Sequence, residues 1–84
     1  MSWYVYILRC EDGSLYTGST NNVEKRMKAH MSGKGARYTR SHKPLEIAYT
    51  EELEDKSSAL KRECEIKKLK RKEKLELTEK VRKQ

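Results

Sequence analysis

Residues 3–18 read WYVYILRCEDGSLYTG, and this stretch predicts a β-hairpin. Residues 3–9 are mostly aromatic or β-branched at odd and even positions alike. This is typical of a strand that is buried on both faces. Residues 14–18 form the predicted return strand. The connection between the two strands ends in Gly13, and glycine adopts a positive φ without strain.

The length of the turn decides whether the two hairpin tyrosines, Tyr6 and Tyr16, share a face of the sheet. A two-residue turn would place them on opposite faces, because one step along a strand moves a side chain to the other side. A three-residue turn over 11–13 places Tyr6 opposite Gly18 and both tyrosines on one face. Such a loop is a type I turn followed by a left-handed residue. We therefore predict the three-residue turn with Gly13 at positive φ, or another bulge that keeps both tyrosines on one face.

The rest of the chain predicts an α+β fold with a small three-stranded sheet flanked by helices, in the order β-β-α-loop-β-α. Residues 19–22 offer several N-cap oxygens for the first helix, and Asn21 with Glu24 resembles a capping box. Gly33 ends this helix, and Asp55 or Ser57 caps the last one. The predicted elements after the hairpin are a helix over 23–31, a basic loop or short helical turn over 34–44, a strand over 45–50, and a long helix from about Ser58 onward.

Length and charge limit the domain count and the class of partner. The 84 residues allow one domain at most, so we expect a single domain over 1–84, with a basic helical extension from about residue 71. Lys and Arg total 20 against 13 Asp and Glu, which gives a net charge of +7. Such a surplus on a small domain favours a polyanionic partner, with nucleic acid ahead of an anionic membrane. A well-hydrated surface is the alternative explanation.

The cysteines and the start of the chain indicate a soluble protein of the cytoplasm, with no membrane association. Cys10 and Cys64 are the only two cysteines and lie far apart, and the chain begins without the basic segment of a signal peptide. No apolar stretch approaches the roughly 20 residues of a membrane span. These cysteines together with His30 and His42 match no zinc-ligand spacing, so we expect no zinc site.

Four residues of the hairpin and the first helix are candidates for catalysis. The hydroxyls of Tyr6 and Tyr16 need hydrogen-bond partners if they are buried, which indicates a polar site on the sheet. Arg26 and His30 lie one turn apart on one face of the predicted helix; the guanidinium suits a phosphate, and the imidazole can exchange a proton near neutral pH. Alternatively, the tyrosines are packing residues and the helix carries an ordinary basic rim. The apolar stripe of this helix is predicted to comprise Val23, Met27 and Met31.

Glu63 is the candidate metal ligand. It falls within the predicted apolar face of the last helix, so its carboxylate must be paired or must bind a cation, because a lone buried charge is costly. A hard oxygen ligand for Mg²⁺ is one interpretation. An ion pair with Lys67 or Lys70 is the other. The apolar face is predicted to comprise Ala59, Leu60, Ile66 and Leu69.

The basic segment between the first helix and the third strand is a candidate nucleic-acid interface. No acidic residue occurs from Lys25 to Leu45. Cations interleaved with an aromatic ring and small residues suit a surface that follows a phosphate backbone, and a solvated loop is the alternative. The residues predicted to bind nucleic acid are Lys34, Arg37, Tyr38, Arg40, Lys43 and, on the last helix, Lys67.

The order of these motifs resembles the GIY-YIG nuclease superfamily, and in particular its small stand-alone bacterial members. The shared elements, over about residues 3–70, are a strand tyrosine, a hairpin, Tyr-x-Gly, Arg-x-x-x-His on a helix, a Gly-Lys-Gly-Ala loop and a helical Glu. The first triplet here is Tyr-Val-Tyr and lacks a glycine. The resemblance implies a metal-dependent DNA endonuclease, with Tyr6, Tyr16, Gly18, Arg26 and His30 as catalytic residues and Glu63 as ligand of one divalent ion, Mg²⁺ or Mn²⁺.

The roles that the resemblance implies follow the chemistry of phosphodiester hydrolysis. Arg26 would stabilise the phosphate, and Tyr6 or His30 would act as general base through a water molecule. Since the chain has no room for a second DNA-reading domain, we expect structure-selective or loose specificity in DNA repair or processing, with RNA as an open alternative and no stable protein partner. Two other classes stay open: a non-catalytic nucleic-acid-binding module on the same fold, and a small basic domain whose last helix docks an acidic protein.

Overall fold

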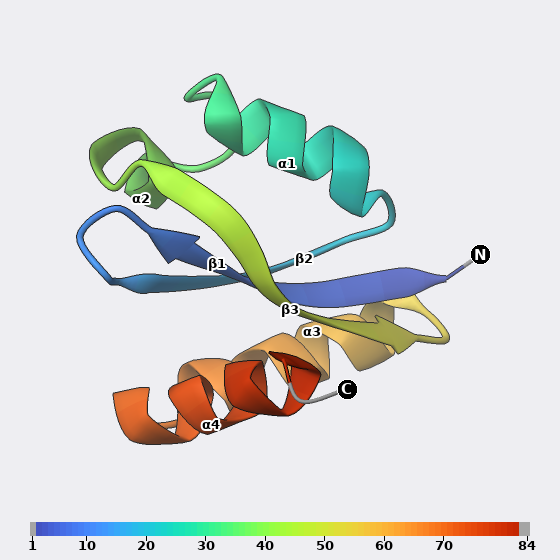
Figure 1. The fold of residues 1–84 in the computed structure, drawn as a ribbon. Helices are drawn as coiled ribbons and strands as arrows, with labels where there is room; N and C mark the ends of the chain where they lie inside the picture. Colours follow the sequence, from blue (N-terminus) through green and yellow to red (C-terminus); the bar gives the residue numbers. More distant parts are fainter. Residues whose placement is uncertain (1, 83–84) are drawn as a thin grey trace.

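A three-stranded antiparallel sheet forms the middle layer of the fold, with helices on both faces (Figure 1). The elements are β1 (Trp3–Cys10), β2 (Leu15–Thr20), α1 (Val23–Met31), α2 (Arg37–Ser41), β3 (Pro44–Leu53), α3 (Lys56–Lys67) and α4 (Arg71–Arg82). In this computed structural model, which describes residues 2–82, the strand order is β2-β1-β3. The expected α+β class and the three-stranded sheet are confirmed. Within 2–82, no helix has both the length and the apolar character needed to cross a bilayer.

The hairpin turn has the predicted length, which places Tyr6 and Tyr16 on the same face of the sheet. Tyr6 pairs with Gly18, and Leu8 pairs with Tyr16, so the two tyrosines lie on one face. The amide of Gly13 donates to the carbonyl of Cys10 at 2.9 Å, and the φ of Gly13 is 83°. The three-residue turn is therefore confirmed, with glycine at its left-handed position.

The central strand β1 is covered on both faces, as its composition predicts. On one side Val5 and Ile7 form the apolar core with Ala59 and Ile66 of α3, and all four are fully buried. Burial of each large aliphatic side chain contributes about 1.5–3 kcal/mol. On the other side Tyr6 points toward α1, where a polar cluster takes the place of an apolar core. One face of the sheet therefore carries the apolar core, and the other carries the polar cluster.

The cap of α1 is one of the predicted N-cap residues, although not the one in the capping-box-like pair. Asn22, and not Asn21, is the N-cap: its side chain accepts a hydrogen bond from the amide of Lys25 at 3.0 Å. Gly33 follows the end of the helix at φ 80°, as expected of a residue that ends a helix. Asp55 caps α3 through the amide of Ser58, which confirms the first of the two predicted caps.

The long final helix of the prediction is divided into α3 and α4. The amide of Lys70 donates to the carboxylate of Glu73 at 3.0 Å, which is the backward half of a capping box and starts a new helix. Arg71 then donates to the carbonyl of Gly13 at 2.8 Å, so the start of α4 is attached to the hairpin turn. Lys and Glu are helix formers throughout this stretch, and propensity alone therefore gave no sign of the break.

Candidate active site

Three rings meet on the face of the sheet below α1. The centroid of the His30 ring lies 5.7 Å from that of Tyr6 and 5.2 Å from that of Tyr16, and both pairs have an edge-to-face geometry. The two tyrosine rings are 6.4 Å apart. His30 is 1% exposed and Tyr6 2% exposed. The hairpin parity and the position of His30 in the last turn of α1 bring the three predicted residues into one cluster.

Hydrogen bonds fix the tautomer of His30. The hydroxyl of Thr39 donates to the carbonyl of Ala36 at 3.1 Å, so its single proton is used there. The same hydroxyl lies 2.9 Å from Nδ1 of His30 and must accept from it, which places the imidazole proton on Nδ1. Nε2 then carries a lone pair, and the hydroxyl of Tyr6 donates to it at 2.8 Å. Tyr6 and His30 therefore form a directed proton path.

Burial keeps both members of this pair neutral. Burial lowers the pKa of His30, and the charge of Arg26 lowers it further. Burial also raises the pKa of Tyr6, while its hydrogen bond with Arg26 acts in the opposite direction. At neutral pH the site therefore holds an uncharged hydroxyl and an uncharged imidazole beside a guanidinium.

Arg26 approaches the cluster from one turn before His30 on α1. Its Nη2 donates to the carbonyl of Gly35 at 2.7 Å, which ties the loop after α1 back to the helix. Hydrogen bonding with Tyr6 is the main cause that raises the pKa of Arg26. Because a guanidinium has five donors in a fixed fork, it can hold this carbonyl and still present N–H groups to a phosphate.

Two glycines allow the close approach of the ring side chains. A Cβ on Gly18 would lie 2.5 Å from the Tyr6 hydroxyl oxygen, so the predicted requirement for glycine there has a direct steric cause. A Cβ on Gly35 would lie 2.7 Å from Cγ of His30. Sequence reasoning did not assign Gly35 or Thr39 to the site. The Gly-Lys-Gly-Ala loop was a signal for Gly35, whereas Thr39 had none.

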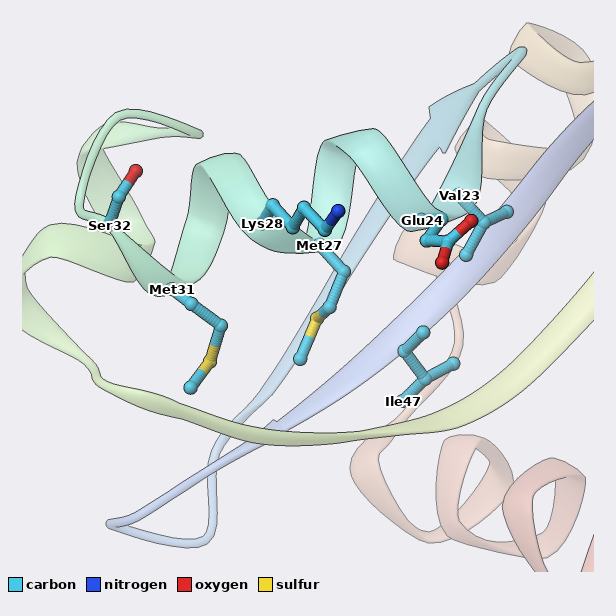
Figure 2. A pocket seen from close by; sticks show the side chains of 7 residues that line it. All are labelled: Val23, Glu24, Met27, Lys28, Met31, Ser32 and Ile47. Carbon is cyan, nitrogen blue, oxygen red and sulfur yellow. The ribbon is translucent and has the colours of Figure 1, made fainter.

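The apolar stripe predicted for α1 is not the covered face of that helix. His30 is buried, whereas Met31 is 54% exposed. Val23, Met27 and Met31 line an open hollow of about 710 Å³ together with Ile47 of β3, and Figure 2 shows both methionines directed into it. The prediction was wrong about coverage because the loop at Gly35 folds back over His30 and covers the polar side of the helix.

Glu63 lies at the outer edge of β2, across the strand from the tyrosines. Its Oε1 accepts from the hydroxyl of Ser19 at 2.6 Å, and its Oε2 accepts from Nζ of Lys67 at 2.7 Å. The side chain of Glu63 is 18% exposed. The ion pair with Lys67, which the sequence left open as the alternative to a metal ligand, is therefore present. Leu60, which was predicted on the same apolar face, is 45% exposed, so that part of the prediction was wrong.

Mg²⁺ suits the donors at Glu63 better than zinc does. In the described part of the chain, no three His, Cys, Asp or Glu side chains come together as a metal-binding group. A structural zinc ion needs four protein ligands, whereas Mg²⁺ is commonly held by one or two carboxylates, waters and substrate phosphates. Glu63 with the Ser19 hydroxyl beside it fits a Mg²⁺ or Mn²⁺ site of that open kind, provided that Lys67 moves away.

The basic segment is partly helical and lies beside the hairpin. The predicted loop contains α2, which is consistent with the short helical turn allowed for it. The amide of Glu11 donates to the carbonyl of Lys43 at 2.8 Å, which joins the segment to the turn. Tyr38 stacks on Tyr16 with ring centroids 5.6 Å apart. The cations predicted to bind nucleic acid are all exposed: Lys34, Arg37, Arg40, Lys43 and Lys67.

A pH-dependent stability follows from the buried His30. Because its folded pKa lies below the unfolded value of about 6.5, the unfolded chain binds the extra proton first. The free energy of unfolding should be fully present above pH 6.5 and should decrease as the pH falls below it, by at most about 1.4 kcal/mol per pH unit. Urea unfolding between pH 5 and 8 measures this. The same series with His30→Gln should lose the slope; an equal slope in both proteins would contradict it.

The family model, the relatives and the solved structures that resemble this chain agree with one another. The GIY-YIG catalytic domain matches residues 2–76. A UPF0213 protein of Clostridium perfringens is 58% identical over 74 residues, which cover 88% of this chain and 80% of the relative. The solution NMR structure of a UPF0213 protein from Bacillus halodurans has a TM-score of 0.59 at 47% identity, covering 94% of this chain and 84% of that one. A solution NMR structure from E. faecalis has a TM-score of 0.65 at 39% identity, covering 100% of this chain and 90% of that one.

Proposed function

This chain belongs to the GIY-YIG catalytic-domain family, and we propose on that premise that it is a metal-dependent endonuclease that hydrolyses phosphodiester bonds of DNA. The observation that carries the proposal is the Tyr6–His30 hydrogen bond of 2.8 Å beside the guanidinium of Arg26. A neutral proton acceptor next to a fixed cation can promote phosphodiester hydrolysis, because the first activates water and the second offsets charge on the phosphoryl oxygens.

Each residue of the cluster has a distinct part in the proposed reaction. A water molecule that attacks phosphorus gives its proton to the oxygen of Tyr6, while Tyr6 passes its own proton to Nε2 of His30. The P–O bond to the leaving sugar oxygen breaks, and this oxygen takes a proton from solvent water. The hydrogen bond from Nδ1 to Thr39 stabilises the imidazolium that results. Arg26 stabilises the negative charge that builds on the phosphoryl oxygens. Glu63 would hold the divalent ion, which supplies further charge stabilisation when it is bound.

The position of β2 at the edge of the sheet supports a site shared by Glu63 and the tyrosines. Gly18 and Ser19 are consecutive residues of this strand, so their side chains point to opposite faces. Tyr6 lies against Gly18, and Glu63 accepts a hydrogen bond from Ser19. The charge of Glu63 also contributes to the raised pKa of Tyr6. A phosphate bound at this edge strand would lie between the groups of the two faces.

The exposed cations beside the site predict a strong dependence of DNA binding on salt. Replacing Lys34, Arg37, Arg40 and Lys43 together with alanine should flatten the log–log slope of affinity against salt by up to about four, because each phosphate contact releases a counterion. Fluorescence anisotropy with a labelled duplex between 50 and 200 mM salt, roughly the range over which such slopes are resolved, measures the change. An unchanged slope would place the DNA elsewhere on the protein.

The test of the proposed function is cleavage by the protein itself. Supercoiled plasmid and a panel of linear, nicked, flapped and four-way DNA should be incubated with Mg²⁺, with Mn²⁺ and with chelator. We expect cutting only with metal, and faster cutting of branched than of linear DNA, which would fit a function in DNA repair or processing. Binding without cutting of any substrate would contradict the endonuclease.

A non-catalytic DNA-binding module is the second candidate, and one contact favours it. Both carboxylate oxygens of Glu63 are already paired, with Ser19 and with Lys67. If Lys67 stayed paired with Glu63 in the presence of a divalent ion, the protein would bind nucleic acid without cleaving it. The Lys67→Met variant separates the two candidates, since an endonuclease limited by this ion pair should cut at lower Mg²⁺ concentration once the lysine is removed.

A further inference from the structure

A row of three stacked rings runs outward from the candidate active site. Tyr16 is its inner member, and the plane of Tyr38 is tilted 27° from it at a centroid distance of 5.6 Å. The ring of His42 lies 4.1 Å from that of Tyr38 and almost parallel to it, at 8°. Tyr38 and His42 are four residues apart at α2, and the carbonyl of Tyr38 accepts from Nδ1 of His42 at 3.0 Å. We call these three residues the ring row.

Packing alone does not account for the ring row. The short helix α2 is anchored by Thr39, which is buried and bonded to His30. Tyr38 and His42 are only partly covered, and the side chain of His42 is 35% exposed. Rings that served only to attach α2 would be expected inside the core. The outer ring, His42, instead lies partly exposed beside Asp12 of the β1–β2 turn. Figure 1 shows α2 next to this turn.

The charges around the ring row suit a nucleic-acid strand. Arg37 and Arg40 belong to the same short helix, Lys34 and Lys43 flank it, and all four are exposed. The acidic group nearest the outer ring is Asp12, whose Oδ2 lies 3.6 Å from Nε2 of His42. Cations can therefore hold a backbone along α2 while the outer face of the His42 ring, the face turned away from Tyr38, is left for a base.

We propose that the ring row is a binding site for an unpaired base, so that the substrate is DNA with single-stranded nucleotides next to the cleaved phosphate. The inference rests on the proposed nuclease function and specifies its substrate class. Bases in a duplex are stacked on one another and cannot reach a side-chain ring, whereas an exposed base can. Aromatic rings beside cationic side chains are the usual means by which proteins bind single strands without reading sequence.

The test compares binding of single-stranded and blunt duplex oligonucleotides of equal length in the presence of chelator, so that no cleavage intervenes. A 2-aminopurine in the single strand reports stacking by loss of its fluorescence. We expect the wild-type protein to prefer the single strand and to quench this base. Tyr38→Leu removes the ring on which His42 stacks, so it should lower the affinity for the single strand about tenfold and abolish quenching, with duplex affinity unchanged. Tyr38→Phe should retain both properties.

Two control variants separate stacking from charge and from folding. Arg40→Ala should weaken single-strand and duplex binding by similar factors, because it removes a phosphate contact. Tyr4→Leu makes the same substitution at a half-buried ring outside the row and should leave the preference intact. His42→Ala tests the outer ring independently, and it keeps the inference falsifiable if Tyr38→Leu fails to fold, which circular dichroism would detect.

Each outcome decides for or against the ring row. Binding without a preference for single strands, or equal losses on both DNAs in Tyr38→Leu, would overturn the inference and leave the nuclease standing. Preference retained in both Tyr38→Leu and His42→Ala would overturn it as well. Absence of binding to any DNA would remove the inference together with the proposed function.

Discussion

Replacing Arg26 with alanine is expected to slow DNA cleavage by about 10²–10³-fold at saturating DNA and Mg²⁺, because the transition state loses its fixed cation. The guanidinium is held by its bond of 2.7 Å to the carbonyl of Gly35 and lies against the Tyr6–His30 pair. Single-turnover cleavage of a labelled flap DNA measures the effect. DNA affinity should change by only a few-fold, since the exposed cations of the basic segment carry most of the binding.

Two companion variants separate the catalytic effect of Arg26 from loss of positive charge. Lys25→Ala removes the neighbouring exposed cation of α1 and should leave the cleavage rate close to that of the wild type. Arg26→Lys keeps the charge but loses the fork that spans Gly35 and a phosphate, so it should recover only part of the rate. Equal rates in Arg26→Ala and the wild type would show that Arg26 serves only to attach the loop.

Replacing Tyr6 with phenylalanine is expected to reduce both cleavage and stability. The hydroxyl is the donor to Nε2 of His30, which is almost completely buried, and without it this nitrogen loses its partner. Leaving a buried acceptor unpaired costs about 1–3 kcal/mol of folding free energy. Loss of the proton path should slow cleavage by about 10²–10⁴-fold. Urea unfolding and single-turnover kinetics measure the two effects.

Tyr4→Phe is the matched control for this variant. Tyr4 is a half-buried ring of the same strand, two residues earlier, and so lies on the same face of the sheet. Its substitution should leave both the unfolding free energy and the rate nearly unchanged. A Tyr6→Phe protein that is less stable but cuts at the wild-type rate would restrict Tyr6 to a structural role and leave another group as the general base.

The tyrosine part of the site could be predicted because local rules determine it. Side chains of a strand alternate between faces, and Gly13 suits only some turn lengths, so the positions of Tyr6, Tyr16 and Gly18 follow from short-range geometry. The one-turn spacing of Arg26 and His30 follows in the same way from the period of a helix. The register and the ring contacts confirm that Tyr6, Tyr16 and His30 meet.

The parts that could not be predicted depend on contacts between distant segments. Whether the methionine side or the histidine side of α1 is covered is decided by the loop that folds back at Gly35. The partner of His30 is Thr39, nine residues later, and no local pattern marks it. The break between α3 and α4 depends on a cap at Glu73 within a sequence that favours helix throughout.

Glu63 has one feature that could be predicted from the sequence and one that could not. Its place on a partly covered helix face could be read from the helical period, and the carboxylate is indeed only 18% exposed. Its contact with Ser19, 44 positions earlier in the chain, could not be read in this way, although this contact holds the carboxylate against β2, on the face opposite the tyrosine cluster. The pairing with Lys67 leaves its use as a metal ligand to experiment.

The most direct measurement is the rate of flap-DNA cleavage as a function of Mg²⁺ concentration, for the wild type and for Glu63→Gln, with DNA binding measured in parallel. Glutamine keeps the shape of the side chain and can still accept from Ser19, but it loses the charge that a divalent ion requires. We expect the wild-type rate to rise with Mg²⁺ and to saturate, and Glu63→Gln to bind DNA normally without cutting it. Cleavage by the wild type in chelator, or by Glu63→Gln at the wild-type rate, would contradict a metal-dependent nuclease built on Glu63.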